Sequence, residues 1–453
     1  MVRTSTTLHD RIDRLDERLE HLAHLVHVPH ARRSAGDGLP ASASSDTPAE
    51  QPPHRELVRR DLAAYAARIR LHELVREHGS PLLVLDPDRV TTQLLELRRA
   101  LPDVRIHFAT ASLPHPAVIR AVDAFGASFA VASRDELDLL ERERVRISRC
   151  VHSAPVKTVA DITSAYLRGI RTFVIDRPSE VAKFAGLPCC DVGVLVRLSV
   201  PEPGTASGRS PEFGVEPDAA AALVDLCLRS RLKVRGFTFH IAGRPTSAEP
   251  WRQAIARTLE LMRVLEERHG IRFEMLDIGG GFPVASGEGV PAIREVARGI
   301  REALADAPDD LEVIVEPGRF VAAPAVTLVS HVIGTSDRAD GRWHHLDVGI
   351  AGADSLSAAG TAQPAVFAVA ELGAQPVGED AFERATRRLL TRTLVPVTLS
   401  GRGAGHDVTA RRVLLPPLRN GDLLVSPMMG GSTWPAVTGA DTPAPARVVV
   451  VGA

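Results

Sequence analysis

A chain of 453 residues exceeds an ordinary single domain, and its hydrophobic fraction of 44% is sufficient for a sizeable buried core. The 54 Lys and Arg residues are nearly balanced by 56 Asp and Glu residues, which leaves a formal net charge of -2. Without an excess of positive charge, the chain is not expected to bind nucleic acid or acidic membrane surfaces.

The cysteines and the absence of apolar runs indicate a reducing, aqueous compartment. Cys150, Cys189, Cys190 and Cys227 show neither the spacing of a metal site nor the density of a disulfide scaffold, so we expect buried free thiols. The N-terminus is charged where a signal peptide needs an apolar run, and no stretch of about 18 apolar residues occurs. We expect a cytoplasmic protein without a membrane partner.

Two segments precede the ordered body of the chain. In residues 1–28, apolar residues such as Leu15, Leu19, Leu22 and Val26 recur at steps of three and four, which predicts an amphipathic helix. Such a helix could form a short coiled coil, dock on a partner or lie on its own body. Residues 29–55 are rich in Ala, Ser, Pro, Asp and Gly without periodicity, so we expect a disordered linker.

Residues 56–320 alternate regularly between β-rich runs and amphipathic helical stretches, after a first helix that ends near His78. Ser133 and Glu136 have the spacing of a capping box at the start of one of these helices. Eight strands alternating with helices predict an α/β fold, a (β/α)8 TIM barrel, rather than an open sheet. The predicted strands span 104–110, 128–133, 149–154, 171–176, 192–200, 233–241, 273–280 and 311–318.

Residues 321–453 follow a different pattern. Short apolar runs such as LVPVTLS, DLLVSP and ARVVVVGA are separated by Gly, Pro and Asp. Such runs are typical of antiparallel strands. We therefore expect a C-terminal all-β domain after the barrel.

The functional residues of a barrel lie at the C-terminal ends of its strands, and the loops after the last two strands commonly bind phosphate. The seventh predicted strand ends in Gly279, Gly280 and Gly281, and the eighth is followed by Gly318 and Arg319. Glycines let backbone N–H groups approach an anion without side-chain clashes, and an arginine adds a planar fork of donors. A tight turn would also explain the glycines, but their position beside EPGR favours a phosphate site.

Two further side chains lie at the ends of predicted strands. His240 ends the sixth strand, where its imidazole could stack on a flat ring or serve as an ordinary core histidine. Glu316 ends the eighth strand, where it could pair with a protonated ring nitrogen or cap the next turn.

The motifs GSPLLVLD, FHIAG, LDIGGGFP and EPGRFV resemble those of the fold-type III pyridoxal-phosphate enzymes. This family contains the ornithine and diaminopimelate decarboxylases and their alanine racemase relatives, each a barrel followed by a β-domain. The resemblance covers about residues 79 to 430. It implies that these motifs contribute to a site for pyridoxal phosphate.

The resemblance also assigns roles to individual residues. It places the cofactor phosphate on the glycine triplet and the arginine that follows Gly318, the pyridine nitrogen on Glu316 and the cofactor ring against His240. Arg197, in LVRLS, and Asp407, in GHDV, also match family positions. The second of these contacts the substrate amino group in the family.

The chain departs from the family at the lysine that binds the cofactor covalently. The family pattern is close to YAVKANPHP, but this chain reads FATASLPHP, with Ala111 at the lysine position. A methyl group cannot form an imine, so rapid covalent exchange with a substrate amine is lost. The FDVAS pattern of the family is FAVAS here, with Ala130 in place of the aspartate.

The β-domain departs from the family as well. The segment that carries the catalytic cysteine in the family reads SGRGAGHDV here, and no cysteine follows Cys227. The tyrosine that completes the phosphate site is replaced within MMGGSTW, where Ser432 or Thr433 stands instead. The chain has three lysines, and Lys157 is a weak candidate for the lost one, since Lys183 and Lys233 lie on outer positions.

Two functions remain open from the sequence. The first is a catalytically degenerate decarboxylase relative that binds pyridoxal phosphate, or another phosphorylated ligand or an amino acid, non-covalently. Such a chain would act as a regulatory subunit, as a homodimer or as a heterodimer with an active homologue.

The second function is an active decarboxylase or racemase-type enzyme. It would use Lys157, or it would carry out other chemistry with an acid–base set. This set would contain His240, Glu316, Arg197, His406 and Asp407. We expect no metal, because His240, His406 and Asp407 form no short-range ligand motif.

Overall fold

The computed structural model describes residues 53–188, 191–200, 212–243, 245–284, 290–348, 365–373, 393–401, 408–431 and 446–452. The helix expected over residues 1–28 and most of the linker expected over 29–55 lie outside these residues. The first described helix, α2, spans Pro53–Arg68 and therefore begins within the expected linker.

Eight parallel strands form a closed barrel, as predicted. The barrel closes because β9 pairs with β2, with Val315 opposite Ile106. Apolar side chains such as Val174, Leu195 and Ile314 fill its interior. The strands are shorter than the predicted runs: β2 Arg105–Ala109, β3 Ser128–Val131, β4 Val151–His152, β5 Thr172–Ile175, β6 Gly193–Arg197, β7 Lys233–Thr238, β8 Met275–Asp277 and β9 Glu312–Val315.

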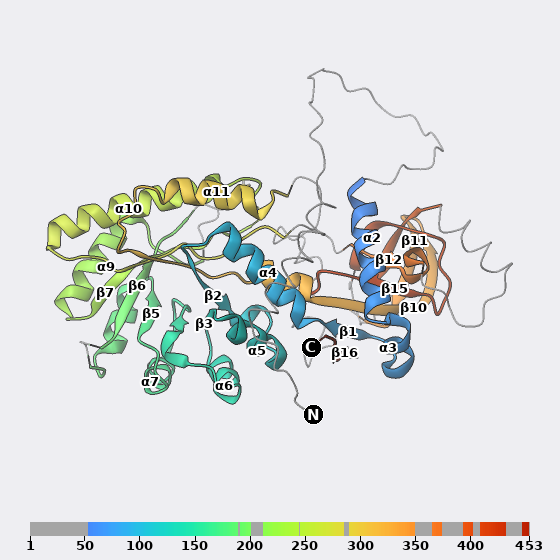
Figure 1. Ribbon diagram of the computed structural model, residues 1–453, viewed down its shortest axis with the longest axis horizontal. Coiled ribbons are helices and arrows are strands. Elements are labelled where there is room, and N and C mark those ends of the chain that lie inside the picture. The colour runs from blue at the N-terminus through green and yellow to red at the C-terminus, as the bar shows by residue number, and fades with distance from the viewer. Residues whose placement is uncertain are drawn as a thin grey trace, which may run out of the picture. The chain divides into compact units, whose positions relative to one another are not determined.

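Helices surround the barrel and bury one face each against the strands (Figure 1). The core between the two layers contains large side chains such as Phe108, Phe129 and Trp251, which are fully buried. Burial of such side chains is the main favourable contribution to folding. The helices are α4 Pro87–Ala100, α5 Pro116–Phe125, α6 Arg134–Arg142, α7 Val159–Leu167, α8 Pro178–Val181, α9 Pro217–Arg229, α10 Glu249–His269, α11 Ile293–Ala303 and α12 Arg319–Ala322.

The start of α6 confirms the predicted cap with one change. The Ser133 hydroxyl accepts a hydrogen bond from the Glu136 backbone N–H at 3.3 Å. The Glu136 carboxylate, however, accepts from the Ala132 backbone N–H at 2.9 Å rather than from that of Ser133. A complete capping box occurs instead at α7, between Thr158 and Asp161.

The second domain contains an eight-stranded sheet that is mixed rather than antiparallel. Strand β13 pairs in parallel with β11, and β16 pairs in parallel with β1, whereas β15 is antiparallel to both of its neighbours. The expectation of antiparallel strands is therefore correct for DLLVSP, incomplete for LVPVTLS, which is parallel to β11 and antiparallel to β14, and wrong for ARVVVVGA, whose strand β16 is parallel to β1. The strands are β1 Leu82–Leu85, β10 Val326–Arg338, β11 Gly341–Leu346, β12 Phe367–Ala368, β13 Val395–Ser400, β14 Val408–Leu415, β15 Leu423–Ser426 and β16 Arg447–Val450.

Residues 53–85 belong to this second domain, although the sequence analysis placed residues from 56 onward with the barrel. Helices α2 and α3 (Leu71–His78) pack their apolar faces on the sheet, with Tyr65 and Leu71 buried against Val329 and Phe367. Arg55 also forms a nearly buried ion pair with Glu371 at 2.9 Å. The local sequence predicts the helix, but its packing depends on residues far along the chain.

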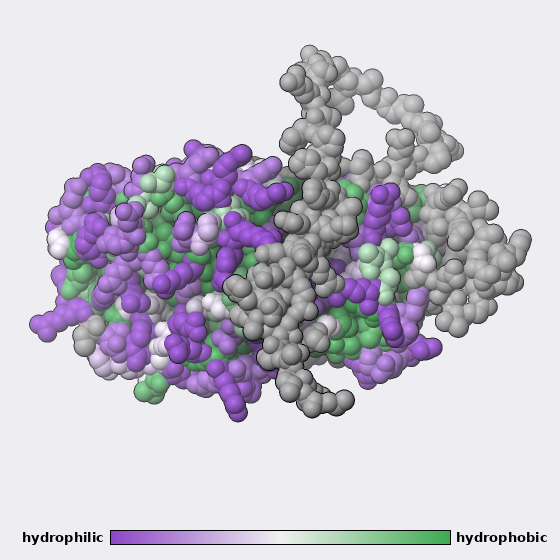
Figure 2. All heavy atoms as spheres, viewed as in Figure 1, coloured by the Kyte–Doolittle hydropathy of each residue, from purple (hydrophilic) through white to green (hydrophobic). Residues whose placement is uncertain are grey.

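The surface and the thiols agree with the composition. Figure 2 shows hydrophilic side chains over most of the visible face of the described residues, with apolar groups between them. Cys150 and Cys227 are buried free thiols, as expected, whereas Cys189 and Cys190 lie outside the described residues. Among the described residues, every helix is too short or too polar to span a membrane.

Candidate ligand-binding site at the barrel mouth

The C-terminal ends of β7, β8 and β9 bring the predicted site residues together. The Gly280 N–H points at the Nδ1 atom of His240 at 3.4 Å, and the Glu316 N–H donates to the Gly279 carbonyl oxygen at 2.8 Å. Arg319 follows at the start of α12, where its guanidinium lies 3.5 Å from the Gly243 carbonyl oxygen. The sequence motifs therefore form one cluster, which we call the mouth cluster: His240, Gly279, Gly280, Gly281, Glu316, Gly318 and Arg319.

The glycine triplet needs glycine at each position. Gly279 and Gly281 have φ values of 65° and 88°, a region that side chains rarely adopt. A Cβ atom at Gly281 would lie 1.9 Å from the Ile241 carbonyl oxygen, and one at Gly280 would lie 2.5 Å from that of Glu316. The loop is thus packed backbone to backbone, and the His240 ring lies against Gly280.

Asp277 holds this loop in place, a role that the sequence analysis missed. Its buried carboxylate accepts hydrogen bonds from the Gly279 N–H at 2.9 Å and from the Thr238 hydroxyl at 2.7 Å. The Gly279 N–H is therefore already used, as is the Gly280 N–H by His240, so a bound anion would depend on the Gly281 N–H and on Arg319. An acidic residue at the end of a buried strand, directly before the glycines, was the available signal.

Glu316 has a strongly perturbed carboxyl group. Burial raises its pKa well above the ordinary value, the charge of Asp277 raises it further and Arg197 partly opposes both. Its Oε1 atom and the Nε atom of Arg197 are buried without a hydrogen-bond partner among the described residues. Buried polar atoms normally have partners, so these two mark a space where a polar ligand would fit.

His240 lines the open part of the cluster. Its side chain is exposed at the mouth, yet the surrounding protein atoms desolvate the ring. This desolvation, together with the charges of Arg197 and Arg319, lowers the pKa of His240 to about 4. The imidazole is therefore neutral at pH 7, which suits contact with the face of a flat ring.

The other side of the cluster is formed by three backbone segments. Gly318 faces Ser112, since a Cβ atom there would lie 3.4 Å from the Ser112 Cβ atom. Gly431, from the MMGGSTW motif, approaches Arg319 so closely that a Cβ atom would lie 2.7 Å from the Arg319 Cγ atom. The sequence motif thus lies next to the predicted phosphate site, although Ser432 and Thr433 lie outside the described residues.

Ala111 lies at the same mouth. It belongs to a short 3-10 turn, Thr110–Ser112, directly after β2, and its side chain is exposed. The Ala109 N–H donates to the Pro317 carbonyl oxygen at 3.1 Å, which fixes this turn beside Gly318. A longer side chain at position 111 would have room to project from the turn. Ala130, the second substituted position, is buried on β3.

Lys157 is held elsewhere. Its ammonium group donates to the Val174 carbonyl oxygen at 2.6 Å and to that of Pro155 at 3.3 Å, and it lies 3.5 Å from the Glu180 carboxylate. Only 1% of its side chain is exposed. Burial lowers its pKa to about 8, opposed by the charge of Glu180. These contacts place Lys157 in the wall between β4 and β5 and none of them is with the mouth cluster.

The structure describes only one of the three remaining candidate residues, Arg197. Arg197 lies beside Glu316, with its charge directed toward that carboxyl group, and its guanidinium carbon lies 5.6 Å from the centre of the Phe213 ring. His406 and Asp407 lie outside the described residues, so of the proposed acid–base set the structure describes only His240, Glu316 and Arg197. Among the described residues, no group of three or more His, Cys, Asp or Glu side chains is arranged for a metal ion.

The mouth cluster fits the chemical groups of pyridoxal phosphate. The orphaned carboxyl oxygen of Glu316 suits a ring nitrogen, the neutral imidazole of His240 suits a ring face, and Arg319 with the glycine N–H groups suits a phosphate. Ser112 and Ala109 lie beside Gly318, and Ala111 stands between them in the turn after β2.

Comparison with known proteins gives matches over most of the described chain. Residues 87–323 match the family described as pyridoxal-dependent decarboxylase, pyridoxal binding domain. A lysine/ornithine decarboxylase from Selenomonas ruminantium is 31% identical over 281 residues, which cover 62% of this chain and 71% of that protein. Antizyme inhibitor 2 from Xenopus laevis is 25% identical over 281 residues, which cover 60% of this chain and 61% of that protein.

A solved structure agrees with both domains. The lysine/ornithine decarboxylase from Vibrio vulnificus, crystallised with putrescine, superposes with a TM-score of 0.73 at 34% sequence identity. The match covers 85% of this chain and 99% of that chain. The barrel with its second sheet is therefore the architecture of that enzyme.

Proposed function

Because this chain belongs to the pyridoxal-dependent decarboxylase family, we propose that it binds pyridoxal phosphate non-covalently and acts as a regulatory subunit rather than as an enzyme. The single observation that carries the proposal is the mouth cluster itself: its ligand-facing groups are present, while Ala111 occupies the position of the covalent anchor.

The chain's own residues would hold the ligand by three kinds of contact. Arg319 and the Gly281 N–H would bind the phosphate, His240 would pack on the ring, and Glu316 would share a proton with the ring nitrogen. When bound, the cofactor supplies an electron-withdrawing ring that stabilises negative charge on a substrate carbon. Charge-assisted hydrogen bonds contribute roughly 1.5–3 kcal/mol each, so a few of them support micromolar affinity.

A regulatory role is supported by the family as well as by the site. One relative carries the name antizyme inhibitor 2, whereas other relatives carry the name of a decarboxylase. We propose that this chain assembles as a homodimer or with an active homologue in the cytoplasm, and that the helix expected over residues 1–28 assists this pairing. The contacts of Lys157 with Val174 and Glu180 make it a poor replacement for the lost lysine.

Binding is tested with purified full chain, an Ala111→Lys variant and an Ala111→Met variant of similar side-chain length. Each is mixed with pyridoxal phosphate, and the visible spectrum is recorded before and after dialysis. Borohydride reduction and mass spectrometry then locate any attached cofactor. We expect reversible, micromolar binding by the natural chain and the methionine variant, and a reduced adduct on residue 111 in the lysine variant.

Two results would overturn this proposal. An adduct on Lys157 in the natural chain would make the protein a candidate enzyme with a relocated lysine. Failure of all three proteins to bind pyridoxal phosphate would remove the ligand-binding function.

The regulatory role is tested by mixing the purified chain with an active decarboxylase of the same family from the same cell. We expect a complex in light scattering and at least a twofold change in the kcat of the partner. A homodimer that leaves the partner's decarboxylation rate unchanged would contradict the role, even where a cell extract yields bound proteins.

A further inference from the structure

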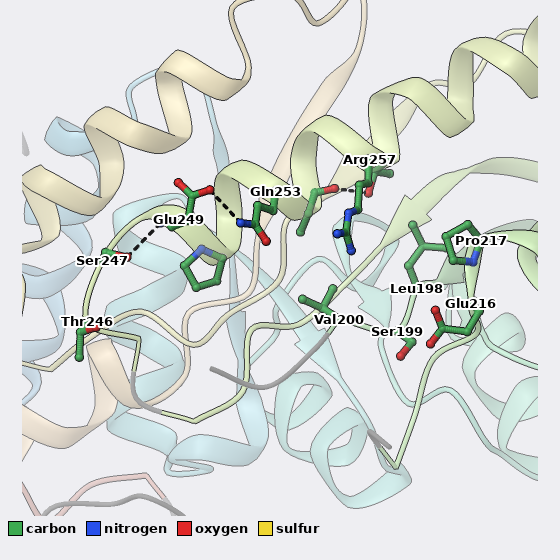
Figure 3. A pocket seen from close by; sticks show the side chains of 13 residues that line it. Leu198, Ser199, Val200, Glu216, Pro217, Thr246, Ser247, Glu249, Gln253 and Arg257 are labelled. Atoms are coloured by element: carbon green, nitrogen blue, oxygen red, sulfur yellow. Dashed lines mark hydrogen bonds between the residues drawn. The ribbon is translucent and has the colours of Figure 1, made fainter. Parts of the chain in front are cut away.

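A second cavity lies outside the mouth cluster and shares no residue with it. It has a volume of about 340 Å³ and lies between the segment that follows β6 and the first half of α10 (Figure 3). This volume is near the lower end for small-molecule sites, which are about 300–1,000 Å³. The cavity therefore has room for a small metabolite.

The floor of the cavity is apolar and firmly packed. Leu198 and Ala254 are buried, and Val200 and Pro250 are half-buried beside them. Figure 3 shows Leu198 and Val200 between the residues of α10 and those of the opposite wall. Such a floor favours contact with an aliphatic chain.

The two walls carry opposite charges. Figure 3 shows the Arg257 guanidinium extending from α10 toward Val200, while Glu216 and Ser199 lie on the opposite wall. Arg257 and Glu216 are exposed, and within the described part of the chain neither side chain has a hydrogen-bond or ion-pair partner. Most other charged side chains nearby are paired, so these two are available to a ligand.

The third charged residue of the lining is already engaged. The Glu249 carboxylate accepts a hydrogen bond from Gln253 at 2.9 Å and lies 3.6 Å from the Arg252 guanidinium. The available charges of the cavity are therefore one cation and one anion. This balance disfavours a phosphate dianion, which Glu216 and Glu249 would repel, and disfavours a polyamine, which Arg257 would repel.

We propose that this cavity binds a small aliphatic amino acid whose carboxylate and ammonium groups lie at opposite ends of the chain. Arg257 binds the carboxylate through its planar fork of donors, and Glu216 accepts from the ammonium group. Leu198 and Val200 contact the methylene groups between them. None of the residues that line the cavity belongs to the mouth cluster.

The experiment is isothermal titration calorimetry of the full chain with 5-aminopentanoate, pentanoate and pentylamine, which share one chain length and differ in their charges. We expect 5-aminopentanoate to bind at least tenfold more tightly than either singly charged analogue. Arg257→Gln and Glu216→Gln should each weaken its binding at least tenfold. Arg263→Gln, on the same helix but paired with Glu260 and Glu267 outside the cavity, is the matched control and should leave binding within twofold.

Each other result would overturn the proposal. Equal binding of pentanoate and 5-aminopentanoate would remove the role of Glu216, and binding that survives Arg257→Gln would place the ligand elsewhere. Absence of binding by all three compounds would show that the cavity is not a site for this class of ligand. Arg319→Met, in the mouth cluster, should leave 5-aminopentanoate binding unchanged, so this test is independent of phosphate binding.

Discussion

Asp277 and Glu316 share one enclosed space at the end of two neighbouring strands, and their charges repel each other. Burial raises the pKa of Asp277 to about 6, opposed by its hydrogen bonds from Thr238 and Gly279. The pKa of Glu316 is raised still further above its usual range. The pair therefore retains protons in the folded state that both groups lose in the unfolded chain.

We predict a pH-dependent stability that the variant Asp277→Asn alters. When a carboxyl group has a higher pKa in the folded state than in the unfolded state, the protein loses stability as pH rises between the two values. For Asp277 these values are near 4 in the unfolded state and about 6 in the folded state. Asp277→Asn does not have this carboxyl group and does not lose stability in this way. The free energy of unfolding of the variant should therefore rise relative to that of the natural chain by on the order of 2–3 kcal/mol across this pH range. Urea unfolding at several pH values measures the difference.

The comparison with the natural chain is essential because buried histidines act in the opposite direction. The pKa values of His107 and His152 are lowered to about 4, mainly by burial, so these groups add stability as pH rises through the same range. Asp103→Asn, at an exposed position, is the control and should show no such change with pH. A constant difference between Asp277→Asn and the natural chain would contradict the assigned protonation.

Single residues of the site were predictable where their chemistry depends on local sequence. The glycines, Arg319, Glu316 and His240 stand next to strand ends, so topology alone brings them together. For Asp277, the local contact with the Gly279 N–H was open to prediction, whereas the contact with Thr238 forms only when β7 and β8 pair. The contacts that hold Lys157 in the barrel wall depend in the same way on how β4 and β5 diverge.

At the scale of elements, the loop after β8 depends on steric exclusion as well as on backbone freedom. We predict that Gly281→Ala destabilises the protein by more than about 3 kcal/mol, because it combines a strained φ value with a contact of 1.9 Å to the Ile241 carbonyl oxygen. Its affinity for pyridoxal phosphate should fall as well, since the loop must move. Urea unfolding and a spectroscopic titration measure the two effects.

Gly270→Ala separates the two contributions to that loss. Gly270 ends α10 with a φ value of 64°, but a Cβ atom there would have no neighbour within 4 Å. Its substitution should cost only the conformational strain, about 1–2 kcal/mol, and leave ligand binding unchanged. Equal losses for the two variants would mean that close packing of the glycine loop contributes nothing.

The regular elements of the barrel were predictable because each strand is an apolar run followed by an amphipathic helix. The lengths of the strands were not predictable. Strand β4, for example, has only two residues, because it pairs only where β3 and β5 both lie next to it. The neighbours of strand β1 were the least predictable, because the run LLVLD has the pattern of any buried strand. Its neighbours are β10 and β16, which come after the whole barrel in the sequence.

At the scale of the whole molecule, the described residues form two sheets. The chain first forms β1 of the second sheet, then the barrel strands, and then the remaining strands of the second sheet. Fold class and the approximate sequence limits of the barrel followed from the repeat of strands and helices. The assignment of residues 53–85 did not, because helix α2 becomes part of the second domain only through partners such as Phe367 and Glu371. Such long-range contacts leave no local pattern.

The pairing of Leu82 with Arg447 has a consequence for how the protein is made. The ribosome synthesises β1 long before β16. The β1 strand therefore has no β16 to pair with while the barrel is being synthesised. Contacts between such distant residues form slowly, because a long loop must close first. During synthesis, the edge of β1 that faces β16 therefore stays unpaired until residues 447–450 are made.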